Sequence, residues 1–491
     1  MNAPVRGLAW EHVSPVTPSP VPDQPLQPPR ENIPSPITLA LGTGIMLQAL
    51  NSSMIAVAMV SIGSHFGAGA EVSWVLSAFY IATAIVSPMA GVLGVVFGAR
   101  RVYLAGLFLV LLGSVLGALA PNLGVLVAGR LIIGVGVATQ MPNAMTIVRV
   151  LAQRHRWRTG SAISVFTVCG QAMSAVGPSL GGLLVGVAGW QSTLWINVLL
   201  VAVSGAWVMV KVPRIAGEGR PEMGLGRRLD IVGALLFGMT VTMLMLFLIS
   251  LTDEISWWTL PLLALFGGVW VWWELQRASL PFIDLRAVAA NRQLANTLGR
   301  TMVTYAAFYC LYYGLPQWFE QGAGMSVSQA GAMMFPMAVV SVCSTFVAAR
   351  MIAVRGPRVV LGIGGLFLLL TGLALALVED SSTPVWLMVV IALVAGVPNG
   401  FNNIGNQGLI NTVTSVEKVG TATGIYKTSQ YVAANLSAVI VALCMSVGAG
   451  DGSAGATDAG LHFTGWAIAA LGAVMTLGII FARKMPVKVR A

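Results

Sequence analysis

The chain has 491 residues, of which 56% are hydrophobic and only 9% are charged, and its mean hydropathy is +0.83. Soluble globular proteins carry about a quarter charged residues, so this composition argues against a soluble enzyme, a nucleic-acid-binding protein and a secreted disulfide scaffold. The net charge of +10 comes from 27 Lys and Arg against 17 Asp and Glu. The excess of apolar surface must face lipid, which predicts an all-α membrane protein.

The first segment of the chain, residues 1–36, contains ten prolines. Proline lacks a backbone N–H and fixes φ, so we expect a disordered tail that forms neither helix nor sheet. The tail has no continuous apolar run of the kind found in a cleaved signal peptide. The first membrane segment is therefore expected to act as the targeting signal.

Fourteen apolar runs follow the tail, and each has the length of a helix that spans a bilayer, about 20 residues. They cover residues 37–62, 73–97, 102–120, 123–148, 160–187, 190–210, 229–251, 257–274, 294–319, 329–349, 357–378, 384–412, 420–447 and 461–482.

The placement of charge agrees with fourteen spans. With the N-terminus in the cytoplasm, 24 of the 27 basic residues lie in the two termini and the even-numbered connections. Lys and Arg concentrate on the cytoplasmic side of membrane proteins. The odd-numbered connections hold no basic residue and several acids, among them Glu71, Glu379 and Asp458. Both termini are therefore predicted to be cytoplasmic.

A weak internal repeat divides the chain. Gly98-Ala-Arg100 recurs as Gly356-Pro-Arg358 at an offset of 258 residues, and a Pro-Asn pair in span 4 recurs in span 12 at an offset of 256. Two related halves of six helices are one recurrent plan of secondary transporters. We expect an N-terminal half at 37–210, a region with a cytoplasmic loop and two inserted helices at 211–293, a C-terminal half at 294–482 and a cytoplasmic tail at 483–491.

Several short motifs point to one family. They are Gly91-Val-Leu followed by Gly98 and Arg100-Arg101, then Arg130-x-x-x-Gly134-x-Gly136, and then Gly177-Pro178-Ser-Leu-Gly181-Gly182. In this arrangement they resemble the fourteen-helix drug:proton antiporter branch of the major facilitator superfamily, the multidrug exporter type. The resemblance covers the whole chain after the tail.

The resemblance implies a multi-pass protein of the bacterial cytoplasmic (inner) membrane that exports small amphipathic compounds by alternating access. It also implies exchange for protons. The usual carboxylates are absent, because Val95 and Asn51 occupy the positions where this branch carries Asp. Gly91, Gly98, Arg100 and Arg101 match a gating signature.

The glycine-rich motif of span 5 has a physical role of its own. Gly177, Gly181 and Gly182 permit close helix approach, and Pro178 permits a bend. Such a helix could support rocking of one half against the other, or it could simply pack tightly.

Three basic residues fall inside predicted spans, namely Arg130, Arg300 and Lys427. A charge at the bilayer centre costs roughly 2.5–3.5 kcal/mol even on the lenient insertion scale, so each should face a cavity or another helix. Arg130 either serves coupling and substrate binding or ties its helix to neighbouring carbonyls. Arg300 and Lys427 either line a cavity or extend to the interface.

Amides form a stripe along span 12. Asn399, Asn402, Asn403 and Asn406 follow the i, i+3, i+4, i+7 spacing of one helix face, and Gln140 and Asn143 occupy the comparable part of span 4. Buried amides need hydrogen-bond partners, so the stripe is predicted to line a cavity. The alternative is interhelical amide bonding.

Span 9 is rich in aromatic residues. Tyr305, Phe308, Tyr309 and Tyr312 share a face, which favours cavity lining and helix packing equally. Trp318 and Phe319 are predicted to belong to an interfacial belt. Glu320 closes the span and is interpreted either as a solvated loop acid or as the nearest proton-titrating group.

The leading hypothesis is therefore a proton-coupled exporter of amphipathic compounds, with a small molecule, the proton and the lipid bilayer as its partners. An exporter of an anionic or neutral metabolite with atypical or no proton coupling is the alternative, and a non-transporting membrane sensor is a third. No enzyme chemistry, metal cluster or cofactor is indicated. Neither a nucleotide nor nucleic acid is expected as a partner, since Lys427 lies two residues too late for a phosphate loop.

Overall fold

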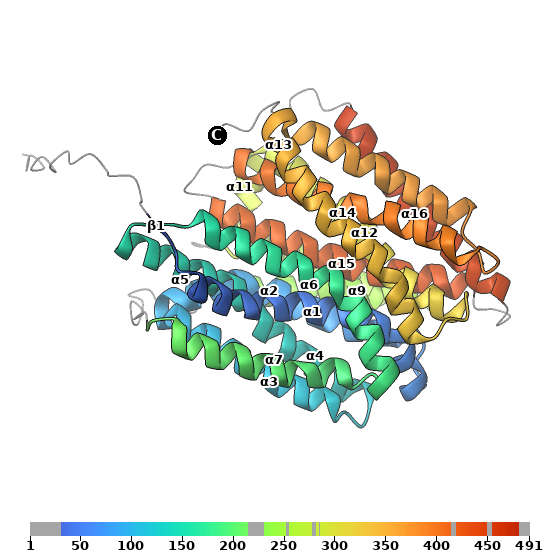
Figure 1. Cartoon of the computed structure of the whole chain (residues 1–491), viewed down its shortest axis with the longest axis horizontal. Helices are drawn as coiled ribbons and strands as arrows, with labels where there is room; N and C mark the ends of the chain where they lie inside the picture. The colour runs from blue at the N-terminus through green and yellow to red at the C-terminus, as the bar shows by residue number, and fades with distance from the viewer. Residues whose placement is uncertain are drawn as a thin grey trace, which may run out of the picture.

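The structure is a computed structural model that describes residues 31–214, 230–251, 255–276, 281–283, 285–413, 419–448 and 454–480. These residues are almost entirely helical, and the expectation of an all-α protein is confirmed (Figure 1). Most of the predicted tail, residues 1–30, and the tail at 483–491 lie outside the described residues.

The N-terminal part has seven helices, a short 3₁₀ turn and two tiny strands. The elements are β1 (Glu31–Asn32), α1 (Ser35–Phe66), η1 (Ala70–Ser73), α2 (Trp74–Phe97), α3 (Ala99–Ala118), α4 (Leu123–Ala138), α5 (Gln140–His155), β2 (Trp157–Arg158), α6 (Gly160–Ala188) and α7 (Ser192–Lys211).

The rest of the described chain adds eight helices. They are α9 (Ile231–Ser250), α10 (Thr259–Gln276), α11 (Leu285–Ala290), α12 (Arg292–Gln321), α13 (Val327–Leu377), α14 (Val385–Val413), α15 (Val419–Gly448) and α16 (Ala454–Ile480).

The end of the proline-rich tail differs from expectation. Glu31–Asn32 pairs in parallel with Trp157–Arg158, and α1 already begins at Ser35. The expectation that residues 1–36 form neither helix nor sheet is therefore wrong at these positions. The physical reason is that Pro36 lies in the first turn of α1, where its missing N–H has no helical partner to lose.

Eleven helical segments of the described residues are long and apolar enough to cross a membrane, or twelve if the two parts of the bent α6 form one span. Helices α4 and α5 together supply one segment, and α13 supplies two, Val327–Ile352 and Val354–Leu377. Helices α10 and α12 are not among them; α12 carries Arg300 and Glu320. A described helix overlaps each of the fourteen predicted intervals, but the count of fourteen spans stays a prediction.

Two turns share a glycine with positive φ. Gly98 and Gly356 both have positive φ, 94° and 78°, a conformation that glycine adopts without steric cost. Two residues later, Arg100 donates to the carbonyl oxygen of Met209 near the end of α7 at 2.7 Å, and Arg358 donates to that of the last residue of α16 at 2.9 Å. The two turns therefore tie equivalent helices.

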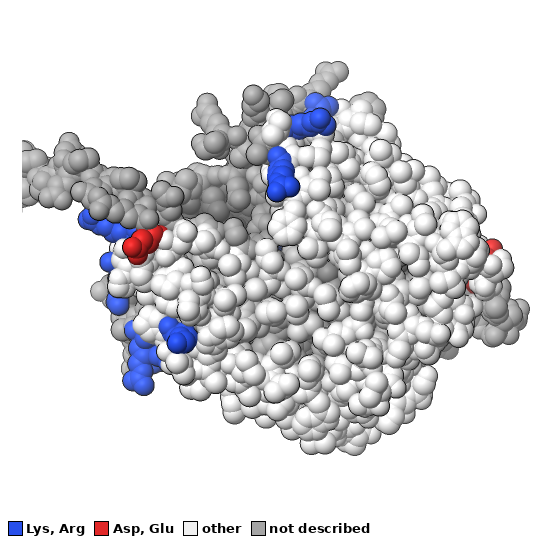
Figure 2. All heavy atoms as spheres, in the orientation of Figure 1, with Lys and Arg blue, Asp and Glu red and all other residues white. Residues whose placement is uncertain are grey.

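The helices lie roughly side by side, with α1–α7 and α12–α16 forming two groups (Figure 1). The groups meet where α6 packs on α13, α2 on α15 and α1 on α12. Helix α9 contacts both α2 and α15. On the face drawn in Figure 2, Lys and Arg gather toward one end and the broad middle carries no charged residue, as expected for a surface in contact with lipid.

Candidate functional site

Three buried polar side chains of the N-terminal group bond to one another. Asn51 on α1 and Asn197 on α7 form a reciprocal amide pair, with both N···O distances at 2.9 Å, and Asn197 also donates to Ser114 on α3 at 2.9 Å. Asn51 is only 2% exposed. The Asn51–Asn197 pair is therefore neutral, and together with Ser114 it joins α1, α7 and α3.

Arg130 on α4 is buried and bonds to backbone. Its Nε donates to the carbonyl oxygen of Val75 at 3.0 Å and its Nη2 to that of Asn51 at 3.1 Å. The guanidinium also lies 4.4 Å from the centroid of the Phe79 ring. The geometry favours the structural interpretation of Arg130, because these groups occupy the side chain and no described carboxylate pairs with it.

Gln140 and Asn143 are also ties between helices. Gln140 donates to the carbonyl oxygen of Tyr103 on α3 at 3.4 Å, and Asn143 donates to that of Ala90 on α2 at 3.2 Å. Both side chains are completely buried. They therefore do not join the amides of α14 in one cavity.

The glycine-rich motif of α6 lies between α1 and α13. A Cβ at Gly181 would come within 2.9 Å of the Met54 backbone, and a Cβ at Gly182 would lie 2.8 Å from the Cα of Gly331. Ser179, next to Pro178, donates to the carbonyl of Gly331 at 2.8 Å. The motif thus holds the two groups of helices in backbone contact at one end of the molecule, which we call the closed end.

The remaining gating candidates that have contacts make them within the N-terminal group. Gly177 packs against Ser53, within the N-terminal group, while a Cβ at Gly91 would meet only Pro142 at 3.8 Å. Arg101 is exposed. Arg100 and Gly98 form the turn described above.

Seven of the eight tyrosines in the chain gather where the two groups of helices meet. They come from α2, α12 and α15 and comprise Tyr80, Tyr305, Tyr309, Tyr312, Tyr313, Tyr426 and Tyr431. We call this set the tyrosine cluster. Tyr313 donates to the Tyr80 hydroxyl at 2.9 Å, and Tyr312 donates to the carbonyl of Ser174.

Hydrogen bonds between the two groups of helices are found in only one part of their length. Among the described residues, they extend from the middle, where Gln48 on α1 donates to the Tyr431 hydroxyl, to the closed end, where Ser328 donates to Gly182 O at 3.1 Å. The opposite end has none of these bonds between described residues.

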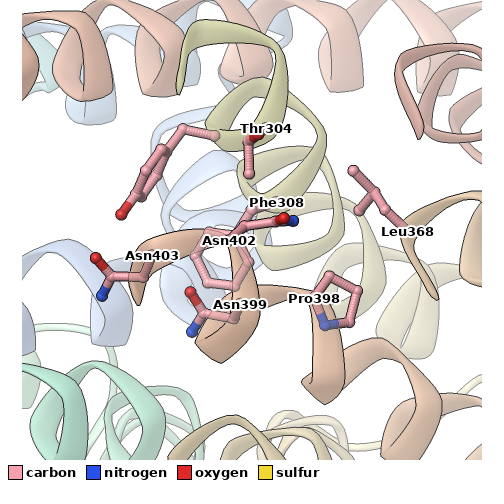
Figure 3. Close-up of a pocket in the computed structure, with 8 residues that line it drawn as sticks. Thr304, Phe308, Leu368, Pro398, Asn399, Asn402 and Asn403 are labelled. Carbon is pink, nitrogen blue, oxygen red and sulfur yellow. The ribbon is translucent and has the colours of Figure 1, made fainter. Parts of the chain in front are cut away.

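A small cavity, with room for about one water molecule, lies beside the tyrosine cluster, within the C-terminal group (Figure 3). Its lining comes from α12, α13 and α14 and comprises Thr304, Tyr305, Phe308, Leu368, Pro398, Asn399, Asn402 and Asn403. Tyr305, Phe308 and three of the four stripe asparagines border this space, and their part in binding a substrate stays a prediction. We call this space the amide cavity.

The stripe asparagines differ in their bonding. Asn399 donates to Ser341 on α13, whereas neither amide atom of Asn402 or Asn406 has a partner, and these two side chains are 1% and 0% exposed. Asn435 on α15 is equally buried and unpartnered, and it is not among the residues predicted from the sequence. Its signal was a lone Asn in the middle of an apolar span.

The two cations of the C-terminal group have polar neighbours but no carboxylate among the described residues. Arg300 donates to Thr297 at 3.1 Å on its own helix, and Lys427 donates to Gln430 at 3.2 Å. Both side chains are partly buried. They lie on α12 and α15, the two helices that carry most of the tyrosine cluster.

The end of α12 departs from the predicted belt. Trp318 and Phe319 are fully buried, and the Trp318 indole donates to Asp458 on α16 at 3.0 Å. Their assignment to an interfacial belt is therefore wrong, because a buried carboxylate supplies the partner that water would supply at an interface. Glu320 is partly buried, and its Oε1 has no partner.

Among the described residues, no group of three His, Cys, Asp or Glu side chains could hold a metal ion. The described acids lie at helix ends or in loops, away from the amide cavity. The described arrangement offers hydrogen bonds and aromatic surface.

Comparisons with known proteins agree with this architecture. The chain is 29% identical over 405 residues to the uncharacterised MFS-type transporter YwoD of Bacillus subtilis (strain 168), covering 82% of this chain and 88% of that protein. It is 26% identical over 412 residues to the multidrug resistance protein Stp of Mycobacterium tuberculosis, covering 82% and 74%.

Among solved structures, the nucleoside transporter NupG superposes with a TM-score of 0.63 at 14% identity, covering 91% of this chain and all of that chain. This identity supports similarity of fold alone. The sequence profile of the Major Facilitator Superfamily matches residues 41–438 and 301–489. The chain therefore belongs to the Major Facilitator Superfamily and is a transporter of that family.

Proposed function

We propose that the protein exports small amphipathic compounds by alternating access, as a member of the fourteen-helix drug:proton antiporter branch. The proposal places it in a bacterial cytoplasmic membrane with both termini inside. The observation that carries it is that the hydrogen bonds between the two groups of helices lie between the middle of the molecule and the closed end. Backbone contact at Gly182 and Gly331 seals one end, and the tyrosine cluster and the amide cavity lie on the other side of that seal.

The similarity to the multidrug resistance protein Stp supports efflux as the direction of transport. With the predicted orientation, the closed end faces outward, so that a compound would enter the central region from the cytoplasm. Parting of Gly182 from Gly331, with closure at the other end, would then release it outside.

Reconstitution tests this proposal directly. Purified full-length protein in proteoliposomes, oriented by protease protection of the termini, should move a fluorescent amphipathic dye down an imposed gradient. Empty liposomes and the Gly182→Leu variant serve as controls. Dye movement equal to that of empty liposomes would contradict export.

Proton exchange is the second part of the proposal, and its support is the family resemblance. A pH-sensitive dye inside the same liposomes should report a pH change on substrate addition. The alternative is export of a neutral or anionic metabolite without proton exchange, and the neutral Asn51–Asn197 pair favours it. Substrate movement with no pH change would select this alternative.

A further inference from the structure

Two buried acids lie side by side at one end of the inserted helices. Asp230 directly precedes α9 and Glu274 lies in the last turn of α10, and the two side chains are 6% and 1% exposed. A Cβ placed at Gly233 on α9 would lie 2.8 Å from Asp230 Cγ and 2.9 Å from Glu274 Oε1. Both carboxyl groups therefore reach the same space beside the first turn of α9. We call these two acids the carboxyl pair.

Asp230 is the better supplied member of the pair. It accepts hydrogen bonds from the Trp273 indole at 2.8 Å and from the backbone N–H groups of Phe282 and Gly233 at 3.0 and 3.1 Å. The bond from Gly233 caps the N-terminus of α9, where the helix dipole also favours a negative charge. Asp230 is therefore suited to carry a charge in its buried position.

Glu274 has fewer and longer bonds. Its Oε1 accepts from the Trp270 indole at 3.2 Å and from the backbone N–H of Ile283 at 3.4 Å. Its Oε2 is buried and has no partner among the described residues. A buried carboxyl group that lacks donors and lies near a second negative charge retains a proton, because the charged form is then doubly disfavoured.

The described partners of both acids are N–H groups of indoles and backbone, and none is a Lys, Arg or His. Helix α9 carries no charged residue, and neither does α2, which packs on it. Of the other neighbours, α15 contributes Lys427, which donates to Gln430, and α11 contributes Arg286, which donates to the carbonyl of Leu275. The tyrosines of α2 and α15 belong to the tyrosine cluster. Charged residues close in sequence but outside the described residues are Arg227, Arg228, Arg277 and Asp284.

The carboxyl pair lies where the inserted helices join the rest of the chain. Phe282 and Ile283, whose N–H groups bond to the pair, lead through α11 into α12, which carries much of the tyrosine cluster. Helix α9 itself contacts α2 of the N-terminal group and α15 of the C-terminal group. A change of charge at the pair therefore acts on elements that touch both groups.

We propose that Asp230 and Glu274 form a proton-binding site at the cytoplasmic end of the inserted helices, with one proton on Glu274 beside a charged Asp230. When Glu274 releases this proton to cytoplasmic water, two negative charges face each other, and their repulsion drives the end of α10 away from the start of α9. This inference rests on the proton exchange of the proposed function and names the acids that carry it in place of those absent at Asn51 and Val95.

Infrared difference spectroscopy on purified full-length protein measures the proton without any transport. The C=O band of protonated carboxyl groups is followed from about pH 5 to pH 9, above the range in which free Asp and Glu side chains release their protons. We expect part of this band to disappear in Glu274→Gln, which separates Glu274 from other buried acids. Glu71→Gln, the same substitution at an exposed acid, should leave the band unchanged.

Asp230→Asn tests the pairing, because the amide keeps the helix cap and removes the neighbouring charge. The titration midpoint of the Glu274 band should fall by about one pH unit in this variant, which is a tenfold loss of proton affinity. If Glu274→Gln does not fold, this shift decides the question by itself. A purely structural role for Asp230 would leave the midpoint where it is in the parent.

Hydrogen exchange at Phe282 and Ile283 tests the movement. After correction for the intrinsic effect of pH on exchange, the parent should exchange faster above the titration midpoint, because the hold of the pair on this segment is then released. Glu274→Gln cannot lose the proton's charge balance, so its exchange should stay slow at every pH. Equal pH dependence in both proteins would overturn the proposed movement.

Two infrared results would overturn the site itself: a carboxyl band that Glu274→Gln leaves intact, or a midpoint that Asp230→Asn leaves unchanged. The proteoliposome measurement separates this inference from the proposed function. If the infrared results are as expected but substrate produces no pH change in the parent, proton exchange fails and the proton-binding site stands. If substrate still produces the pH change in Glu274→Gln, exchange stands and its assignment to the carboxyl pair fails.

Discussion

Asn51 and Asn197 bond to each other through both amide atoms, and the carbonyl of Asn51 also accepts a hydrogen bond from Arg130. One residue on α1 thereby connects α4 and α7. The position that would carry an acid in the resembled branch is instead a neutral junction. In the C-terminal group, by contrast, neither amide atom of Asn402, Asn406 or Asn435 has a partner among the described residues.

Asn51→Ala should destabilise the protein by about 1–3 kcal/mol, because it leaves the Asn197 amide buried with only Ser114 as a partner. The measurement is thermal unfolding in detergent micelles. Ser114→Ala should cost less, since it removes one bond and leaves the amide pair intact. If the Asn51→Ala variant is as stable as the parent, Asn51 does not stabilise the contact between these helices.

Arg130→Lys should destabilise the N-terminal group by about 1.5–3 kcal/mol, because one ammonium cannot reach both carbonyls that Nε and Nη2 now contact. Arg101→Lys provides the matched control at an exposed arginine. Chemical unfolding compares the two. If Arg130→Lys unfolds like the control and only substrate affinity changes, Arg130 acts on the substrate.

Gly182→Ala should open the closed end. The new Cβ would lie 2.6 Å from the carbonyl oxygen of Val327, and such overpacking costs about 1–3 kcal/mol. A cysteine placed at Ser328 should therefore react faster with a membrane-impermeant maleimide in this variant. Gly268→Ala on α10, where a Cβ meets nothing within 4 Å, should leave the reaction rate unchanged.

Glu379 should make stability depend on pH. It lies in the connection between α13 and α14, it is 1% exposed, and neither carboxylate oxygen has a partner. Burial raises the pKa of this carboxyl to about 8, so the folded protein retains a proton that the unfolded chain releases near pH 4.5. Stability should therefore fall as pH rises from about 4.5 toward 8.

Glu379→Gln removes this titration. The unfolding midpoint of the variant should equal that of the parent near pH 4.5 and exceed it increasingly up to about pH 8. Asp380→Asn, at the neighbouring position, is the control, because the hydrogen bonds that Asp380 accepts from Ser382 and Thr383 lower its pKa. Parallel curves for Glu379→Gln and the parent would show that Glu379 carries its charge in the folded protein.

Much of the fold followed from residue patterns. Lipid offers no partner to backbone groups, so apolar runs of this length must become helices, and the described helices overlap the predicted intervals. The repeated turns at Gly98 and Gly356 were also visible, since glycine followed two residues later by arginine is a local pattern. Helix α12 was harder to judge by hydropathy because it carries Arg300 and many tyrosines.

The candidate site, too, was only partly predictable from the sequence. Helical spacing alone placed Asn399, Asn402, Asn403 and Asn406 on one face, and three of them line the amide cavity. Spacing could not tell which amide is bonded, because Asn399 finds its partner on α13 and Asn402 fits against Gly364, both far away in sequence. Asn435, the burial of Trp318 and the gathering of seven tyrosines likewise depend on contacts between helices.

Composition and charge by themselves determined a basic, helical, lipid-embedded chain, because burial in lipid depends on local hydrophobicity. Only the tertiary structure decided which polar groups find partners. The Asn51 amide bonds to Asn197 and its carbonyl accepts from Arg130, whereas the amides of Asn402 and Asn406 have no partner among the described residues. Hydrogen bonding inside the membrane is a property of pairs of helices, and a single helix does not contain it.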